Sequence, residues 1–286
     1  MGIFSDILLT VDFDRTLTAP DSTIPQRNID AIHYFIDNGG IFTLNTGRST
    51  NTMGNMLHTI PVNAPFLLYN GSAAYDTVHR KLCNSKIIDM DIWQTMAQVH
   101  SAFPEMNLEI QGWDTHYLYH AHDSFVEFYD HLGWGHKKAI PGMDVGPFLK
   151  FAIWGIECDP TQGVGQFFSG SEAELRHMDE IEQWIAKQYG DKVVVFRAAP
   201  RIIDVHAKGV SKLACARQLQ KDLGRKILVC VGDAENDLTM LEGAEYAFCP
   251  SDGVVANRFP NVCDCGQGAV ADVIYKEIPA ILKNNP

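Results

Sequence analysis

Short apolar runs alternate with amphipathic segments in the first third of the chain, and this alternation limits the possible folds more than any other feature. The apolar runs Ile7 to Val11 and Ile41 to Asn45 flank an amphipathic segment from Gln26 to Asn38. Apolar runs of this length suit strands that are buried on both faces of a parallel sheet. The order of strand, helix and strand predicts a βαβ unit.

The same alternation continues to about residue 84 and returns in the last third. A third apolar run, Pro65 to Gly71, follows a helical pattern at Thr50 to His58 and ends at Asn70-Gly71, a strong turn signal. We expect these strands to be parallel. The elements expected after the middle of the chain are a helix at Ser211 to Leu223, a strand at Lys226 to Gly232, a helix at Asp237 to Gly243, a strand at Tyr246 to Pro250 and a final helical segment.

Between these two parts, strands follow one another in pairs and the pattern changes. The expected helices are Asp91 to Phe103, Ser124 to Leu132 and Glu172 to Tyr189, and the expected strands are Met106 to Gly112, Thr115 to His120, Phe148 to Ile156, Lys192 to Ala198 and Arg201 to Ala207. Paired strands with separate helices are typical of an α+β module. We therefore predict one α/β domain, residues 1–84 and 200–286, interrupted by an inserted α+β domain, residues 85–199.

Composition excludes several classes of protein. Hydrophobic residues make up 46% of the chain and charged residues 20%, as in soluble globular proteins, and no apolar stretch is long enough to span a membrane. The formal net charge of −12 argues against a nucleic-acid partner. No secretory signal is visible, and seven scattered cysteines do not resemble a disulfide framework, so we expect a cytoplasmic protein.

Polar side chains follow the predicted strands where a ligand site is expected, beyond the carboxyl ends of a parallel sheet. These are Asp12 and Asp14 after the first strand, Thr46, Gly47 and Arg48 after the second, Lys212 at the start of a helix, and Asp233, Asn236 and Asp237 after the strand that ends at Gly232. Taken singly, each has an ordinary interpretation as a helix cap, a turn residue or a surface lysine. Their shared placement favours one site.

Four carboxylates at one edge would raise one another's pKa unless a cation lay among them, and oxygen ligands favour Mg²⁺. A magnesium ion, a lysine, a hydroxyl and free backbone amides are what a phosphoryl group needs, because its transfer is catalysed mainly by positioning and by charge neutralisation. The sequence therefore predicts a phosphate ester as the ligand.

The segments Val11 to Thr18, Leu44 to Ser49, Lys208 to Lys212 and Gly232 to Leu241 resemble the four motifs of the haloacid dehalogenase (HAD) phosphatase superfamily. Asn70-Gly71 and the segment Gly266 to Ile274 are similar to the Cof-type subclass, and the inserted module is similar to the C2-type cap of subclass IIB. The resemblance covers the whole chain. It implies a Rossmann-like core with a parallel sheet and a cap that reads the leaving group, and it is uninformative about the substrate.

The resemblance also implies a role for each residue of the site. Asp12 would be the nucleophile that forms an aspartyl-phosphate, and Asp14 the general acid and base. Thr46, Gly47, Lys212 and Asn236 would bind the phosphoryl group, and Thr46 and Lys212 would also take part in catalysis. Mg²⁺ would be bound by Asp12, Asp233 and the backbone carbonyl of Asp14, while Asn236 and Asp237 would either orient the lysine or bind the metal through water.

Two further features stay open. Arg15 stands where the family usually has Gly, which requires an ordinary φ at this turn. Its side chain could narrow the entrance to the site, supply a positive charge to the substrate, or simply face solvent. His116 and His120 fall on one face of an expected strand, where we interpret them as surface residues of a hairpin.

The leading hypothesis is a Mg²⁺-dependent phosphomonoester hydrolase acting on a small phosphorylated metabolite, with a sugar phosphate as the first candidate. Two alternatives remain: a sugar phosphomutase, and a non-catalytic protein that senses phosphate with the same pocket. We expect neither a nucleic-acid nor a membrane partner, and the sequence leaves the oligomeric state open.

Overall fold

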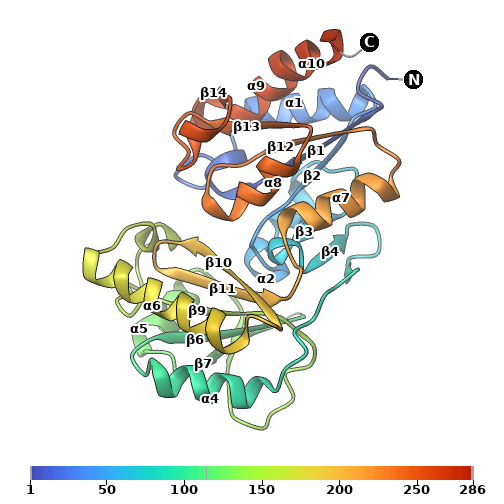
Figure 1. Ribbon diagram of the computed structural model, residues 1–286. Coiled ribbons are helices and arrows are strands. Elements are labelled where there is room, and N and C mark those ends of the chain that lie inside the picture. Colours follow the sequence, from blue (N-terminus) through green and yellow to red (C-terminus); the bar gives the residue numbers. More distant parts are fainter. Residues whose placement is uncertain (1, 114, 285–286) are drawn as a thin grey trace. The chain divides into compact units, whose positions relative to one another are not determined.

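The computed structural model describes residues 2–113 and 115–284, and the chain divides into two compact units (Figure 1). The first unit comprises Met1–Arg48, Gly54–Cys83 and Ser211–Pro286, and the second comprises Ser49–Met53 and Asn84–Val210. The first unit is built on a parallel sheet and the second on a mainly antiparallel one. The predicted fold class, an α/β core interrupted by an α+β module, is confirmed.

Five parallel strands form the central sheet of the first unit, in the order β14-β13-β12-β1-β2. Their bounds are β1 Ile7–Val11, β2 Ile41–Leu44, β12 Ile227–Val231, β13 Tyr246–Pro250 and β14 Asn261–Val262. All five residues of β1 are buried, because this strand lies between β12 and β2 and is covered on both faces. The carboxyl ends of β1, β2 and β12 therefore meet at one edge of the sheet.

Helices cover both faces of this sheet (Figure 1). One face carries α1 Gln26–Asp37, α9 Ala269–Asp272 and α10 Ile278–Asn284, and the other carries α7 Lys212–Asp222 and α8 Leu238–Gly243. The amphipathic pattern of α1 explains its place, because Ala31, Ile32 and Phe35 recur at helical spacing and are all buried.

The region after β2 departs from the prediction. The third strand, β3 Phe66–Leu68, forms a parallel bridge to Asn45 but pairs antiparallel with β4 Ala73–Asp76, which in turn pairs with β5 Lys81–Cys83. The predicted strand β3 is parallel to β2 at this bridge, as expected, whereas β4 and β5 were not predicted and are antiparallel because the turn at Asn70-Gly71 reverses the chain. The expected helix at Thr50 to His58 is two short helices, α2 Thr50–Met53 and α3 Met56–Thr59, separated at Gly54 with φ +49°.

A six-stranded sheet in the order β10-β11-β9-β6-β7-β8 forms the second unit. Its strands are β6 Asn107–Gly112, β7 His116–Tyr119, β8 His136–Lys138, β9 Phe148–Trp154, β10 Val193–Ala199 and β11 Ile202–Ala207, and its longer helices are α4 Ile92–Ala102, α5 Asp123–His131 and α6 Glu172–Tyr189. Neighbours are antiparallel except β7 and β8. The strand β8 was not anticipated, since its residues are His, Lys and Lys.

The second unit extends further along the chain than expected. β11 lies beyond the predicted boundary at residue 200, yet it pairs with both β9 and β10. The unit accordingly ends at Val210 and also takes in the short segment Ser49–Met53.

Among residues 2–113 and 115–284, none of the helices combines the length and the apolar character that crossing a lipid bilayer requires.

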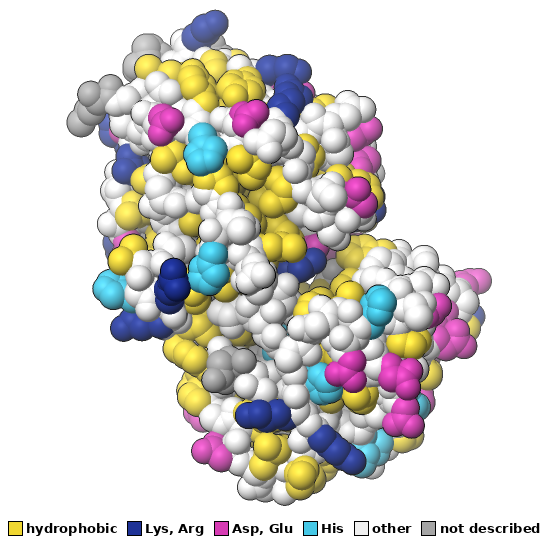
Figure 2. Space-filling view, turned by 180° about the vertical axis from the view of Figure 1, so that it is seen from behind, with side chains coloured by type: hydrophobic (Ala, Val, Ile, Leu, Met, Phe, Trp, Pro, Cys, Tyr) yellow, Lys and Arg dark blue, Asp and Glu magenta, His cyan; other side chains and the backbone are white. Residues whose placement is uncertain are grey.

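On the face in Figure 2, Lys and Arg side chains are scattered among acidic, histidine and apolar ones.

Candidate active site

The first unit brings Asp12 and Lys212 into direct contact, although 200 residues separate them in the chain. Asp12 directly follows β1, and its backbone N–H still donates to the Val231 carbonyl at 2.9 Å, so the sheet fixes the position of this residue. Lys212 is the first residue of α7, and Asn45 donates a hydrogen bond to its carbonyl at 2.8 Å. Both side chains are almost completely buried. The lysine Nζ donates to Asp12 Oδ1 at 2.5 Å.

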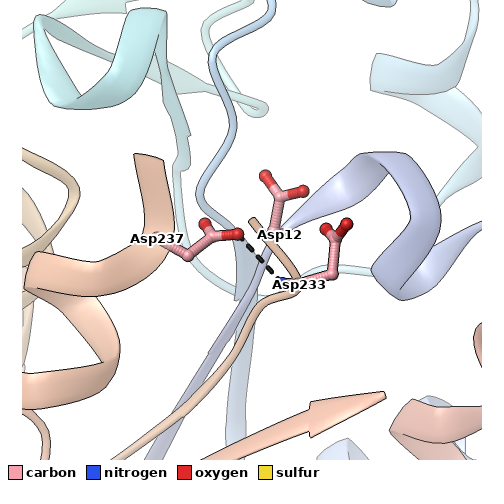
Figure 3. A group of neighbouring side chains, drawn as sticks. All are labelled: Asp12, Asp233 and Asp237. Atoms are coloured by element: carbon pink, nitrogen blue, oxygen red, sulfur yellow. Dashed lines mark hydrogen bonds between the residues drawn. The ribbon is translucent and has the colours of Figure 1, made fainter. Parts of the chain in front are cut away.

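Two further carboxylates, from the loop after β12, complete the cluster. Asp12, Asp233 and Asp237 each offer a carboxylate oxygen, and these oxygens lie within 4.8 Å of one another (Figure 3). Asp237 is held on both sides: Oδ1 accepts from Lys212 Nζ at 2.6 Å, and Oδ2 accepts from the backbone N–H groups of Asp233 at 3.0 Å and Ala234 at 3.1 Å. Of the two roles expected for Asp237, this geometry favours orienting the lysine.

Burial and mutual repulsion dominate the electrostatics of the cluster. Burial raises the pKa of Asp12 to about 7, against the opposing charge of Lys212, and Asp237 and Asp14 add to the rise. The pKa of Asp233 is raised well above its ordinary value by burial and then by Asp12 and Asp237. Burial alone would lower the pKa of Lys212, but the charges of Asp12 and Asp237 outweigh it and raise that pKa. The lysine therefore stays charged. The positive charge that it supplies is not sufficient to keep the pKa values of Asp12 and Asp233 in their ordinary range.

This imbalance provides a test of whether the residues fit a divalent cation. Three buried carboxylates share one buried lysine, so another positive charge would stabilise their ionised forms. The donors are carboxylate oxygens, which suit a hard ion such as Mg²⁺. Thr16 donates to Asp233 Oδ1 at 2.9 Å and orients this carboxylate. The donor set fits Mg²⁺.

The residues after β2 contribute a hydroxyl and a close backbone approach. Thr46 is buried, and its hydroxyl accepts from the Arg48 N–H at 3.2 Å, so its own proton can be donated elsewhere. A Cβ at Gly47 would lie 3.0 Å from Asn70 Oδ1, so the backbone approaches this side chain closely. Asn236 Nδ2 lies 3.5 Å from the same oxygen. The turn that contains Asn70 thus links Thr46, Gly47 and Asn236.

Asp14 lies outside the cluster of three carboxylates. Its two side-chain oxygens accept from the guanidinium of Arg48 at 2.8 and 2.7 Å. The next residue, Arg15, has φ +57° and not the ordinary φ that we expected. Its side chain is 39% exposed, and its guanidinium lies 3.9 Å from Asp252. The turn thus keeps the left-handed backbone that glycine adopts most readily, even though an arginine occupies it.

The structure also identifies site residues that the sequence did not single out. Thr16 and Asn45 hold Asp233 and Lys212 in place. A signal for both was present, because each is a polar residue within or next to a buried apolar run. Arg48 was recognised only as part of a motif, and its pairing with Asp14 could not be read from the sequence.

The interpretation of His116 as a surface residue was wrong. Its ring is fully buried in the second unit, where Nδ1 lies 2.6 Å from Glu109 Oε1 and Nε2 lies 2.8 Å from Ser49 Oγ. His120 follows β7 and is exposed, with φ +48°. The expected alternation failed because β7 ends at Tyr119, so His116 and His120 do not share a face of one strand.

Residues 9–255 match the family model of haloacid dehalogenase-like hydrolases, which is most of the chain and includes every residue of the site. The chain belongs to this family. Among its curated relatives, an HMP-PP phosphatase of Yersinia enterocolitica is 25% identical over 82% of this chain and 80% of its own length. A 5-amino-6-(5-phospho-D-ribitylamino)uracil phosphatase of Bacillus subtilis is 24% identical over 83% and 85%.

Solved structures of HAD-like hydrolases share the fold. One from Bacteroides thetaiotaomicron superposes with a TM-score of 0.76 at 16% identity, covering 94% of this chain and 98% of its own. A sugar phosphatase of HAD subclass IIB superposes with a TM-score of 0.75 at 17% identity, covering 95% and 98%. The likeness covers both units of this chain and concerns the fold.

Proposed function

We propose that this HAD-like hydrolase is a Mg²⁺-dependent phosphomonoesterase that acts on a small phosphorylated metabolite through an aspartyl-phosphate at Asp12. The observation that carries the proposal is the buried contact of Lys212 Nζ with Asp12 Oδ1 at 2.5 Å and Asp237 Oδ1 at 2.6 Å. A lysine held in this way keeps Asp12 oriented and supplies a fixed positive charge for an anionic substrate.

The first chemical step would be attack by Asp12. Its carboxylate oxygen forms a bond to phosphorus while the bond from phosphorus to the leaving-group oxygen breaks, and Asp14 gives a proton to that oxygen. In the second step, water attacks phosphorus and gives a proton to Asp14, and the bond from phosphorus to Asp12 breaks. Inorganic phosphate is released, and both aspartates return to their starting forms.

Other residues would bind the phosphoryl group or the metal. Thr46 Oγ1, the Gly47 amide and Asn236 would donate hydrogen bonds to phosphoryl oxygens. Asp12, Asp233 and the Asp14 carbonyl would hold Mg²⁺, and Asp237 would act through Lys212. When bound, Mg²⁺ would neutralise negative charge shared by the carboxylates and the phosphoryl oxygens.

The class of substrate is inferred from the relatives. Their names include HMP-PP and aminouracil phosphatases, and a structural neighbour is a sugar phosphatase. We propose that the substrate is a phosphorylated small molecule of this kind, with sugar phosphates tested first. A cytoplasmic location is part of the same proposal.

The decisive experiment measures phosphate release from a panel of sugar phosphates, HMP-PP and 5-amino-6-(5-phospho-D-ribitylamino)uracil, with Mg²⁺ and with EDTA. We expect Mg²⁺-dependent release from at least one of these compounds. Isomerised sugar phosphate without release would indicate the phosphomutase instead. Binding without either reaction would indicate the phosphate sensor, a function for which a leaving-group acid at Asp14 has no use.

A further inference from the structure

Arg48 binds the side chain of Asp14 through two parallel hydrogen bonds. Nε donates to Oδ2 at 2.8 Å and Nη2 donates to Oδ1 at 2.7 Å, so the planar guanidinium meets the carboxylate edge to edge. Paired bonds of this type fix the orientation of a carboxylate as well as its position, which a single contact with a point charge cannot do.

The Arg48 residue of this pair is itself held by other residues of the site. The Arg48 N–H donates to Thr46 Oγ1 at 3.2 Å, and its carbonyl accepts from the Tyr69 N–H at 3.0 Å. The guanidinium carbon lies 4.9 Å from the centre of the Phe13 ring. The Arg48 side chain is 17% exposed and the Asp14 side chain 37%. These contacts distinguish the pair from a mobile surface salt bridge.

The charges of the pair reinforce this geometry. Burial alone would lower the pKa of Arg48, but the charge and the hydrogen bonds of Asp14 outweigh burial and raise it. Asp14 has no contact of this kind with Lys212, which is bound to Asp12 and Asp237. The two catalytic aspartates are therefore oriented by separate cations, Asp12 by the lysine and Asp14 by the arginine.

We propose that Arg48 is the positioning residue of Asp14: it holds one oxygen of this carboxylate so that the other can turn to the leaving-group oxygen and then to water. This inference rests on the proposed function. In the arrangement described here both oxygens are engaged, so one of the two hydrogen bonds has to be exchanged for the substrate. An arginine can break one of these hydrogen bonds and keep the other, because its guanidinium group carries several N–H groups.

Leaving-group dependence tests this role, because a good leaving group needs less help from an acid. The values of kcat/KM are measured for p-nitrophenyl phosphate and for phenyl phosphate, whose leaving group is more basic. We expect Arg48→Ala to lower kcat/KM for phenyl phosphate about tenfold more than for p-nitrophenyl phosphate, and Asp14→Asn to show the same bias. Added guanidinium ion should restore part of the loss in Arg48→Ala.

A double-mutant cycle then separates positioning from direct binding of the phosphoryl group. If Arg48 acts through Asp14, adding Arg48→Ala to Asp14→Asn should change kcat/KM for phenyl phosphate by less than about threefold, and guanidinium should not rescue the double variant. The matched control is Arg27→Ala, which removes another arginine paired with an aspartate, Asp272, from the first unit. It should affect both esters alike.

Each other outcome counts against a specific claim. Equal losses with both esters, or the full Arg48→Ala loss in the Asp14→Asn background, would overturn the positioning role and leave the proposed function standing. Absence of turnover in the wild-type protein on all phosphate esters would overturn the proposed function and this inference together. Thermal unfolding of each variant identifies any that has lost its fold.

Discussion

At the scale of single residues, the proposed chemistry depends on a few charged side chains whose partners differ. Asp12 shares Lys212 with Asp237, Asp14 is paired with Arg48, and Asp233 is bound by a hydroxyl from Thr16. Carboxylates of the same type therefore have different environments at one edge of the sheet. Under the proposed function, such differences would allow one aspartate to attack while another moves protons.

Replacing Asp12 by Asn tests the nucleophile. We expect turnover to fall at least about a thousandfold, because no carboxylate oxygen remains to attack phosphorus. The fold should persist, since the change removes one charge from a crowded acidic cluster, and the melting temperature without metal should be equal or higher. Steady-state kinetics and thermal unfolding measure the two effects. Asp21→Asn, at an exposed aspartate, is the control and should keep full activity.

The raised pKa values predict how stability depends on pH without metal. The pKa of Asp12 rises from an ordinary 3.8 to about 7 in the folded protein, and that of Asp233 also rises, so folding favours their protonated forms. Their contribution is therefore fully present below about pH 4 and is lost as pH increases to about 7, by up to about 1.4 kcal/mol per pH unit for each titrating group.

Urea unfolding in EDTA between pH 4 and pH 8 measures this dependence, with Asp233→Asn as the comparison. The free energy of unfolding of the wild type should fall more steeply with pH than that of the variant. Adding Mg²⁺ at pH 8 should stabilise the wild type and have much less effect on Asp233→Asn. If the free energy of unfolding had the same pH dependence in the two proteins, ionisation of Asp233 in the cluster would not destabilise the fold.

At the scale of elements, the loop after β12 is built so tightly that one glycine is required. A Cβ at Gly232 would lie 2.5 Å from Asp237 Cγ, and Asp237 cannot withdraw easily because Lys212 and two backbone amides hold its carboxylate. The close approach of strand end and helix start is what brings the carboxylate to the lysine.

Gly232→Ala should therefore destabilise the protein by about 1–3 kcal/mol and also lower activity, since the clash displaces Asp237 and with it Lys212. The matched control is Gly165→Ala, where an added Cβ would meet nothing within 4 Å. Urea unfolding and phosphatase assays on both variants measure the effects. Full activity in Gly232→Ala would mean that Asp237 does not orient the lysine.

At the scale of the whole molecule, the carboxylates of the candidate site, Lys212 and Thr46 all belong to the first unit, so the second unit is available for a different task. We predict that it reads the leaving group, because the phosphoryl site by itself offers no selectivity between esters. The segment to replace is residues 84–210, the bounds of the second unit's main segment, and not the predicted domain bounds 85–199.

Replacing residues 84–210 by a short Gly/Ser linker should lower kcat/KM most for the preferred metabolite and least for p-nitrophenyl phosphate. Circular dichroism and Mg²⁺ binding establish whether the shortened protein folds. If it folds, binds Mg²⁺ and ranks the substrates as the full chain does, the second unit does not carry specificity.

The features that the sequence determined are those set by local chemistry. Apolar runs such as Ile7 to Val11 become buried strands, and polar residues directly after them reach the edge of a parallel sheet because strand ends share that edge. The strand-end positions of Asp12, Thr46 and Asp233 therefore followed from periodicity, and their predicted roles from the family motifs. The fold class followed for the same reason.

Tertiary structure alone decided which partner each side chain takes. The chain contains several cations that could have paired with Asp14, and only the packing of β1 beside β2 brings Arg48 to it. Likewise β11 joined the second unit through pairing with β9, and His116 was buried by contacts with Glu109 and Ser49. Contacts between residues far apart in the chain produce no periodic pattern in the local sequence. They became visible only once the strands were placed side by side.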